Sequence, residues 1–248
     1  MEAGPLLVHG FAKGEIVESL RRLLGERARK LISAQSSDGL VALATRLDEL
    51  DVARAFEDSE TVTALALDHA HVLARIASVH DIVPLRLGTL VSGRGALLDL
   101  CETQAAPMRE ALEAVSGHVE FGVRLIASPE VRPKATERPT DGRSYLRARS
   151  RERGADARFG EAQREYQATL AERLMALACV KSLDIGSASA GKGRALDAAC
   201  LVERRGKDAF AEFVAREVLT ARELSLSLQV TGPWPAYSFV AAPTARVN

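Results

Sequence analysis

The sequence predicts an α+β protein of two domains, and three observations indicate this class. Short apolar segments alternate with longer stretches in which apolar residues recur every three or four positions, the spacing of a buried helix face. The length of 248 residues suits one large domain or two small ones, each able to bury a core. Apolar residues make up 47% of the chain, which is typical of a globular protein and argues against wholesale disorder.

The first half of the chain predicts three strands and three helices. An apolar strand over 5–11 precedes a stripe of apolar residues at helical spacing over 16–31. The turn signal Ser37-Asp38-Gly39 introduces a strand over 40–47. The remaining expected elements are a helix over 62–79, a strand over 82–91 and a helix over 97–115. We expect residues 1–115 to form an N-terminal domain with a modified ferredoxin-like α+β arrangement.

The second half predicts the order β-α-β-β-α-β. Val119, Phe121, Val123 and Leu125 alternate with small or polar residues, as in a half-buried strand. A loop with three prolines is expected over 128–140. The later elements are a long helix over 142–180, strands over 182–189 and 195–203, a helix over 210–218 and a strand over 224–231. This order is typical of the ferredoxin-like fold, and we assign 116–248 to a C-terminal domain of that type.

Charge and cysteine usage indicate the compartment and the classes of partner. The 33 basic and 33 acidic residues balance, which argues against attraction of the whole chain to nucleic acid or a lipid membrane. The three cysteines are far apart and lack a C-x-x-C spacing, as expected in a reducing compartment. The first residues do not resemble a secretion signal, and no apolar run is long enough to span a membrane. We therefore expect the protein in the cytoplasm.

No catalytic residues, cofactor site or metal site are predicted. The segment Gly186–Gly193 matches the phosphate-binding P-loop except at its last position, where Gly193 lacks the hydroxyl that would hold magnesium. Residues 195–203 alternate like a strand, so this loop does not open a helix, whose N-terminus would supply the anion site. A flexible hairpin turn is the favoured interpretation. The alternative is a nucleotide-binding enzyme that uses the loop Gly186–Lys192.

The histidines also give no metal site. His69 and His71 are two residues apart on an expected helix, so their side chains point about 200° apart and cannot share an ion. His69 falls within an apolar stripe, which predicts a hydrogen-bonded residue of the core.

A cluster of arginines opens the long helix of the second half. The segment Arg143–Arg153 carries five arginines and a single acidic residue, Glu152. Positive charge at a helix N-terminus is unfavourable to the helix dipole. A partner carboxylate or phosphate would relieve this repulsion; the alternative is a solvated helix entry.

The C-terminal run Thr231–Phe239 contains the only tryptophan of the chain. Trp234 lies between two prolines, so its backbone is extended and stiff. This predicts either a packing latch that closes the core of the second domain or an exposed aromatic anchor for a partner. An RNA-binding module would need stacking aromatics on the central strands, where Phe121 alone is available.

Four stretches together resemble the gas vesicle protein F/L family (GvpF/GvpL). They are Val83–Thr89, Gly117–Arg124, Gly142–Leu146 and Gly232–Phe239. Their order and spacing agree over essentially the whole chain, and the Trp-Pro-x-Tyr-Ser-Phe ending is the most specific. The family usually has Phe where Leu87 stands and a second Pro where Ala236 stands. The residues do not distinguish the F branch from the L branch.

The resemblance implies a non-enzymatic accessory protein without a cofactor, which binds the hydrophobic structural shell protein of gas vesicles and assists vesicle assembly. Other gas vesicle accessory proteins are further implied partners, and the implied location is the cytoplasm, at the gas vesicle. The N-terminal domain is the part implicated in contacting the shell protein. The candidate partner-binding or family-motif residues are Arg86, Thr89, Arg143, Tyr145, Trp234 and Tyr237.

Overall fold

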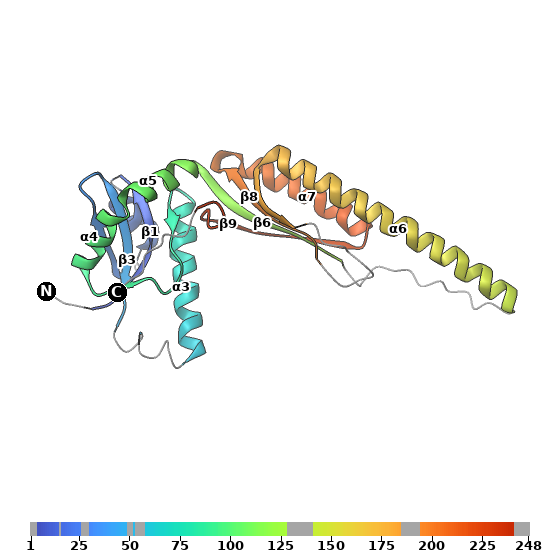
Figure 1. Cartoon of the computed structure of the whole chain (residues 1–248), viewed down its shortest axis with the longest axis horizontal. Coiled ribbons are helices and arrows are strands. Elements are labelled where there is room, and N and C mark those ends of the chain that lie inside the picture. The colour runs from blue at the N-terminus through green and yellow to red at the C-terminus, as the bar shows by residue number, and fades with distance from the viewer. Residues whose placement is uncertain are drawn as a thin grey trace. The chain divides into compact units, whose positions relative to one another are not determined.

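The chain has an α+β fold that forms two compact units. The computed structural model describes residues 4–14, 16–25, 30–48, 52, 58–127, 141–184 and 194–240. Contacts group the chain into a first unit, Met1–Glu120 with Gly232–Asn248, and a second unit, Phe121–Thr231. Each unit contains one β-sheet with packed helices (Figure 1).

The sheet of the first unit has the strand order β2-β3-β1-β4, and β5 also pairs with β1. Every one of these pairs is antiparallel. The strands are β1 (Leu6–Lys13), β2 (Leu31–Gln35), β3 (Leu40–Arg46), β4 (Val83–Pro84) and β5 (Leu90–Val91). Because β1 is central and buried along nearly its whole length, both of its faces must be covered by helices.

Helices cover both faces of this sheet, with α3 and α4 on opposite sides of β1 and β3 (Figure 1). Helices α1 (Val17–Leu24) and α3 (Ser59–Ala77) pack with Val41 and Leu43 of β3. Helices α4 (Arg94–Thr103) and α5 (Ala105–Ala114) pack with Ala42 and Ala44 of the same strand. The first unit therefore differs from an arrangement with helices on one face, which the term ferredoxin-like implies.

Strand β1 contains a β-bulge at His9. Val8 lies opposite Ala44 and Gly10 lies opposite Leu43, so His9 is an extra residue in the register with β3. The bulge shifts the alternation of side chains by one position. As a result Leu6, Val8 and Phe11 all belong to the core cluster under α4 and α5, although their spacing changes from two residues to three.

Two first-half elements were predicted too long. The expected helix over 16–31 ends at Leu24, where Gly25 adopts a positive φ of 58°. Leu31, assigned to that helix, lies in β2 and pairs with Thr45. The expected strand over 82–91 consists of the two short strands β4 and β5, because a turn with Gly88 at a φ of +91° separates them.

The expected helix over 97–115 is divided into α4 and α5 at Gln104. Pro107 explains the division, because a proline has no N–H to donate and its ring clashes with the carbonyl four residues earlier, at Thr103. The apolar positions of the stripe still face the core: Leu97, Cys101, Met108 and Leu112 are all buried.

The described elements of the second half follow the predicted order β-α-β-β-α-β. They are β6 (His118–Ala127), α6 (Gly142–Leu177), β7 (Cys179–Asp184), β8 (Arg194–Glu203), α7 (Lys207–Glu223) and β9 (Leu226–Trp234), with a short 3-10 helix at Arg204–Gly206. The sheet order is β7-β8-β6-β9. The predicted start of the long helix is confirmed, since the Asp141 side chain accepts hydrogen bonds from the backbone N–H groups of Arg143 and Ser144 at 2.8 Å each.

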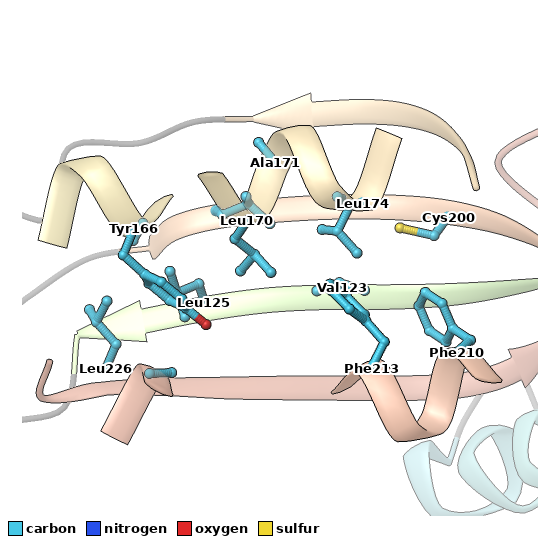
Figure 2. Packing of buried hydrophobic residues seen from close by; sticks show 14 of the residues in the cluster. Val123, Leu125, Tyr166, Leu170, Ala171, Leu174, Cys200, Phe210, Phe213 and Leu226 are labelled. Carbon is cyan, nitrogen blue, oxygen red and sulfur yellow. The ribbon is translucent and has the colours of Figure 1, made fainter. Parts of the chain in front are cut away.

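Both helices of the second unit pack on one apolar face of the sheet (Figure 2). Val123 and Leu125 of β6 contribute the strand side of this core, as the alternation predicted. Leu170 of α6 is fully buried, and the ring of Phe210 lies 4.9 Å from that of Phe121. The alternate position Arg124 forms a salt bridge of 3.2 Å with Asp197 of β8.

Shortening Leu170 to Ala should destabilise the protein, because it removes a fully buried side chain and leaves a cavity between α6 and the sheet. We expect a loss of about 2–5 kcal/mol in the free energy of unfolding, measured by urea denaturation with circular dichroism. Met175→Ala on the same helix is the matched control, since Met175 is 53% exposed. Equal losses for the two variants would contradict this packing.

Candidate functional site

The family-like segment Val83–Thr89 forms a tight turn at the edge of the first sheet. The Thr89 hydroxyl donates a hydrogen bond of 2.9 Å to the carbonyl of Arg86, which closes the turn. Backbone hydrogen bonds of 2.8 Å hold both ends, from Leu85 N–H to the His9 carbonyl and from Val8 N–H to the Thr89 carbonyl. The Arg86 and Leu87 side chains are consequently exposed at the tip.

An apolar groove lies beside this turn. Its volume is about 250 Å³, and the described residues that line it carry no polar side chain. The lining residues are Leu7, Leu47, Val52, Val62, Leu65, Leu87, Gly88 and Leu90. Val62 at the start of α3 and Leu87 at the tip of the turn are 39% and 40% exposed, so the groove is open to a partner. An open apolar groove is a site for an apolar side chain or an amphipathic helix.

A chain of hydrogen bonds links α3 to this turn through the sheet. His9 Nδ1 lies 2.9 Å from His69 Nδ1, and both side chains are buried. His9 Nε2 lies 3.1 Å from Thr45 Oγ1 of β3, and His69 Nε2 lies 3.1 Å from the carbonyl oxygen of Leu85. This confirms the prediction that His69 is a hydrogen-bonded core residue.

One assignment of protons satisfies every atom of the chain with two neutral imidazoles. The Leu85 carbonyl can only accept, so His69 donates from Nε2 and its Nδ1 accepts from His9. His9 then donates from Nδ1, and its Nε2 accepts from the Thr45 hydroxyl. Burial favours these neutral forms: it lowers the pKa of His9 to about 3, with His69 as a smaller cause. Burial also lowers the pKa of His69, against the opposing hydrogen bond to Leu85.

The candidates Arg143 and Tyr145 lie in the second unit, in the first turn of α6. They are far in sequence from the residues that line the groove. Both side chains are exposed. The Tyr145 hydroxyl accepts a hydrogen bond of 2.6 Å from Arg149, whose guanidinium carbon lies 5.9 Å from the ring centroid. This contact lies within one helix and does not join the turn at Arg86 to α6.

The candidates Trp234 and Tyr237 lie in the segment that returns to the first unit. The Ser238 N–H and hydroxyl donate to the Glu120 carboxylate at 2.8 and 2.7 Å, and Val240 packs against the core under α4 and α5. Burial and the nearby Glu120 charge raise the pKa of Tyr237 to about 12. The predicted latch on the core of the second domain is therefore wrong: these contacts lie in the first unit.

Within that segment, the buried residues are not the aromatic ones. Pro235 and Ala236 are buried, whereas Trp234 and Tyr237 are 37% and 40% exposed. Ala236 occupies the position where the family usually has a second proline, and its burial fits a packing role.

Several sequence expectations concern other kinds of site. The loop Gly186–Gly193 lies outside the described residues. In the ranges that the structure describes, no group of three or more His, Cys, Asp and Glu residues is arranged to hold a metal ion. None of the helices in those ranges combines the length and apolarity needed to cross a membrane.

Sequence reasoning missed His9 and the groove. His9 stands inside an otherwise apolar strand, and a polar residue there signals a buried partner, but not which one. The groove gathers residues from β1, α3 and the turn, and nothing in the local pattern marks Leu7 and Leu87 as neighbours. The family resemblance did indicate Arg86 and Thr89, which lie on either side of the groove residues Leu87 and Gly88.

The fold is similar to that of two solved gas vesicle proteins. The chain is similar to the crystal structure of the gas vesicle protein GvpF from Anabaena sp. PCC7120, with a TM-score of 0.63 and 14% identity over the full length of both chains. It is also similar to GvpF from Microcystis aeruginosa, with a TM-score of 0.62 and 13% identity over 95% of this chain and 98% of that one.

Sequence comparison gives the family itself. The model of the family described as gas vesicle synthesis protein GvpL/GvpF matches residues 6–241. Gas vesicle protein L of Streptomyces sp. (strain CB03234) is 31% identical over an alignment of 202 positions, and this match covers 77% of this chain and 74% of that protein. The chain belongs to the GvpL/GvpF family, as its motifs indicated.

The buried histidine pair predicts how stability depends on pH. The pKa of His9 falls from 6.5 in the unfolded chain to about 3 in the fold, so below pH 6.5 the unfolded chain binds a proton that the fold excludes. The contribution of neutral, buried His9 to the free energy of unfolding is fully present above pH 6.5 and is lost as the pH falls toward 3. Between these two pKa values, one such histidine contributes up to about 1.4 kcal/mol per pH unit to the slope of the unfolding free energy against pH.

The variant His9→Asn should reduce the slope of unfolding free energy against pH by roughly this amount below pH 6, measured by urea denaturation at several pH values. His71→Asn is the control, because His71 is an exposed residue of the same helix as His69. An unchanged slope in His9→Asn would show that His9 does not titrate on unfolding.

Proposed function

We propose that this chain is a non-enzymatic gas vesicle accessory protein that binds the hydrophobic shell protein and assists vesicle assembly. The observation that carries the proposal is the apolar groove bordered by the family-like turn. All of the groove residues lie within 1–115, the part of the chain that the family resemblance associates with shell-protein contact. We further propose a cytoplasmic location at the gas vesicle, with other accessory proteins as additional partners and no nucleic acid or lipid membrane among them.

The groove has the chemistry that such a partner requires. A shell subunit with a large apolar surface self-associates unless that surface is covered. Apolar burial contributes roughly 25 cal/mol per Å², so covering one leucine side chain contributes about 1.5–3 kcal/mol. The described lining is apolar, so it can take such a residue without leaving a buried polar group of that lining unpaired.

The walls of the groove suit an apolar helix. Val62 and Leu65, three residues apart on α3, line the groove together with Leu87 and Gly88 of the turn. Gly88 has a φ of +91° and nothing within 4 Å of the position where a Cβ would stand. A partner can approach the backbone closely there. The mode we propose is an amphipathic helix whose apolar face fills the groove.

The strand order β7-β8-β6-β9 of the second unit, with α6 and α7 as the connections between strands, is the order of a ferredoxin-like sheet. We propose that it is a separate domain of that type. Its role in assembly is then distinct from shell-protein binding, which we assign to the first unit.

Replacing Leu87 by Asp should weaken binding of the shell protein, because it places a charge in the groove at a position already 40% exposed. The measurement is recovery of co-expressed shell protein on the affinity-tagged full chain. We expect at least a roughly tenfold loss, the equivalent of about 1.4 kcal/mol.

Leu219→Asp is the matched control, since Leu219 is an exposed leucine of α7 in the other unit. Thermal unfolding of both variants checks that the fold is intact. Full recovery of shell protein by folded Leu87→Asp would exclude the groove as the binding site. If the unmodified chain recovers no shell protein, the proposed function itself is wrong.

A further inference from the structure

The first half of α6 is exposed in the part of the chain that the structure describes. The helix has 36 residues, about 54 Å, but its buried residues begin only at Tyr166. From Asp141 to Arg158 every side chain that the structure describes is exposed, apart from the half-buried Ser144. Figure 1 shows this half of α6 extending past α7 and the sheet of its own unit. The described core of the unit therefore does not account for its presence.

Four arginines form a stripe along this free half. At 100° per residue, Arg143, Arg147, Arg151 and Arg158 lie within about 80° of one another and span about 22 Å of the helix axis. We call them the arginine stripe. Across Gly142–Arg158 there are six arginines, no lysine and only two acidic residues, Glu152 and Asp156. Arginine forks bind carboxylates in two parallel hydrogen bonds, which lysine cannot do.

This charge pattern opposes helix formation in the isolated chain. Arg143 and Arg147, and Arg147 and Arg151, are like charges four residues apart, which repel on a helix surface. Arg143 also lies in the first turn, where the helix dipole disfavours a cation. The Asp141 cap offsets part of this cost. A partner that brings negative charge to the stripe removes the repulsion and favours the helix.

Gly154 is a second, independent observation on the same face. It lies at about 20° on the same helical projection, inside the arginine stripe. Glycine in a helix interior is unfavourable relative to alanine. Nothing lies within 4 Å of the position where a Cβ on Gly154 would stand. Close packing within the described chain therefore does not require a glycine at this position. A missing side chain between arginines allows the backbone of a second helix to approach.

We propose that the arginine stripe is a docking surface for an acidic helix of a partner protein. Carboxylates at a spacing of four residues on a second helix match Arg143, Arg147 and Arg151, and Gly154 permits close contact. A single-stranded RNA partner is disfavoured, because base stacking needs exposed aromatic faces. The one aromatic of this segment, Tyr145, projects away from the stripe and contacts Arg149.

Charge reversal on the two sides of α6 tests this surface. The full chain is titrated with a labelled alanine-rich helical peptide that carries glutamates along one face, and with an oligouridine RNA, in low salt. The double variant Arg147→Glu with Arg151→Glu should bind the peptide at least roughly tenfold more weakly. The control is Arg149→Glu with Arg153→Glu, which changes the same charge on the opposite side of the same helix and should bind nearly normally.

A third variant separates close docking from diffuse attraction. Gly154→Leu keeps the charge and favours the helix, yet it should weaken peptide binding severalfold by blocking close approach. Circular dichroism confirms the helix in each variant.

Four results would overturn the proposal: equal losses in the two double variants, normal binding by Gly154→Leu, tighter binding of the RNA than of the peptide, or no binding of the peptide. This proposal does not rest on the groove, because the two experiments change residues in different units and can fail separately.

Discussion

The first unit depends on one buried polar contact, the hydrogen bond between His9 and His69. The bulge in β1 places His9 toward α3, while Val8 and Phe11 on either side of it face the opposite core. An imidazole in this apolar layer is tolerated only because each of its nitrogens has a partner, in Thr45 and in His69. The same contact fixes which turn of α3 lies over β1, since His69 on that turn supplies the acceptor for His9.

The histidine contact also positions the groove. His69 donates to the Leu85 carbonyl, and Leu85 donates its own N–H to the His9 carbonyl. The turn that begins at Arg86 is thereby fixed relative to α3. Val62 and Leu65 are on that same helix, so the network holds the groove residues of α3 and those of the turn relative to one another.

The two units expose surfaces of opposite chemistry. The first presents a groove whose described lining is apolar, where binding energy comes from apolar burial and changes little with salt. The second presents exposed arginines on α6, whose attraction for a partner is long-ranged and screened by salt. A protein that takes part in an assembly can use the second kind of contact to recruit and orient a partner, and the first kind to hold an apolar one.

The sequence by itself determined the elements whose signals are local. The alternation from Val119 to Leu125 predicted β6, because it reflects burial of one face of the strand. The long helix predicted from residue 142 likewise corresponds to α6. The motifs likewise indicated the family. Only the tertiary structure decided that Leu31 lies in a strand, since its spacing fits a helix equally well and pairing with Thr45 settles the choice. It also decided the His9–His69 contact and the groove, because residues such as Leu7 and Leu87 become neighbours only through the path of the chain, which no local spacing encodes.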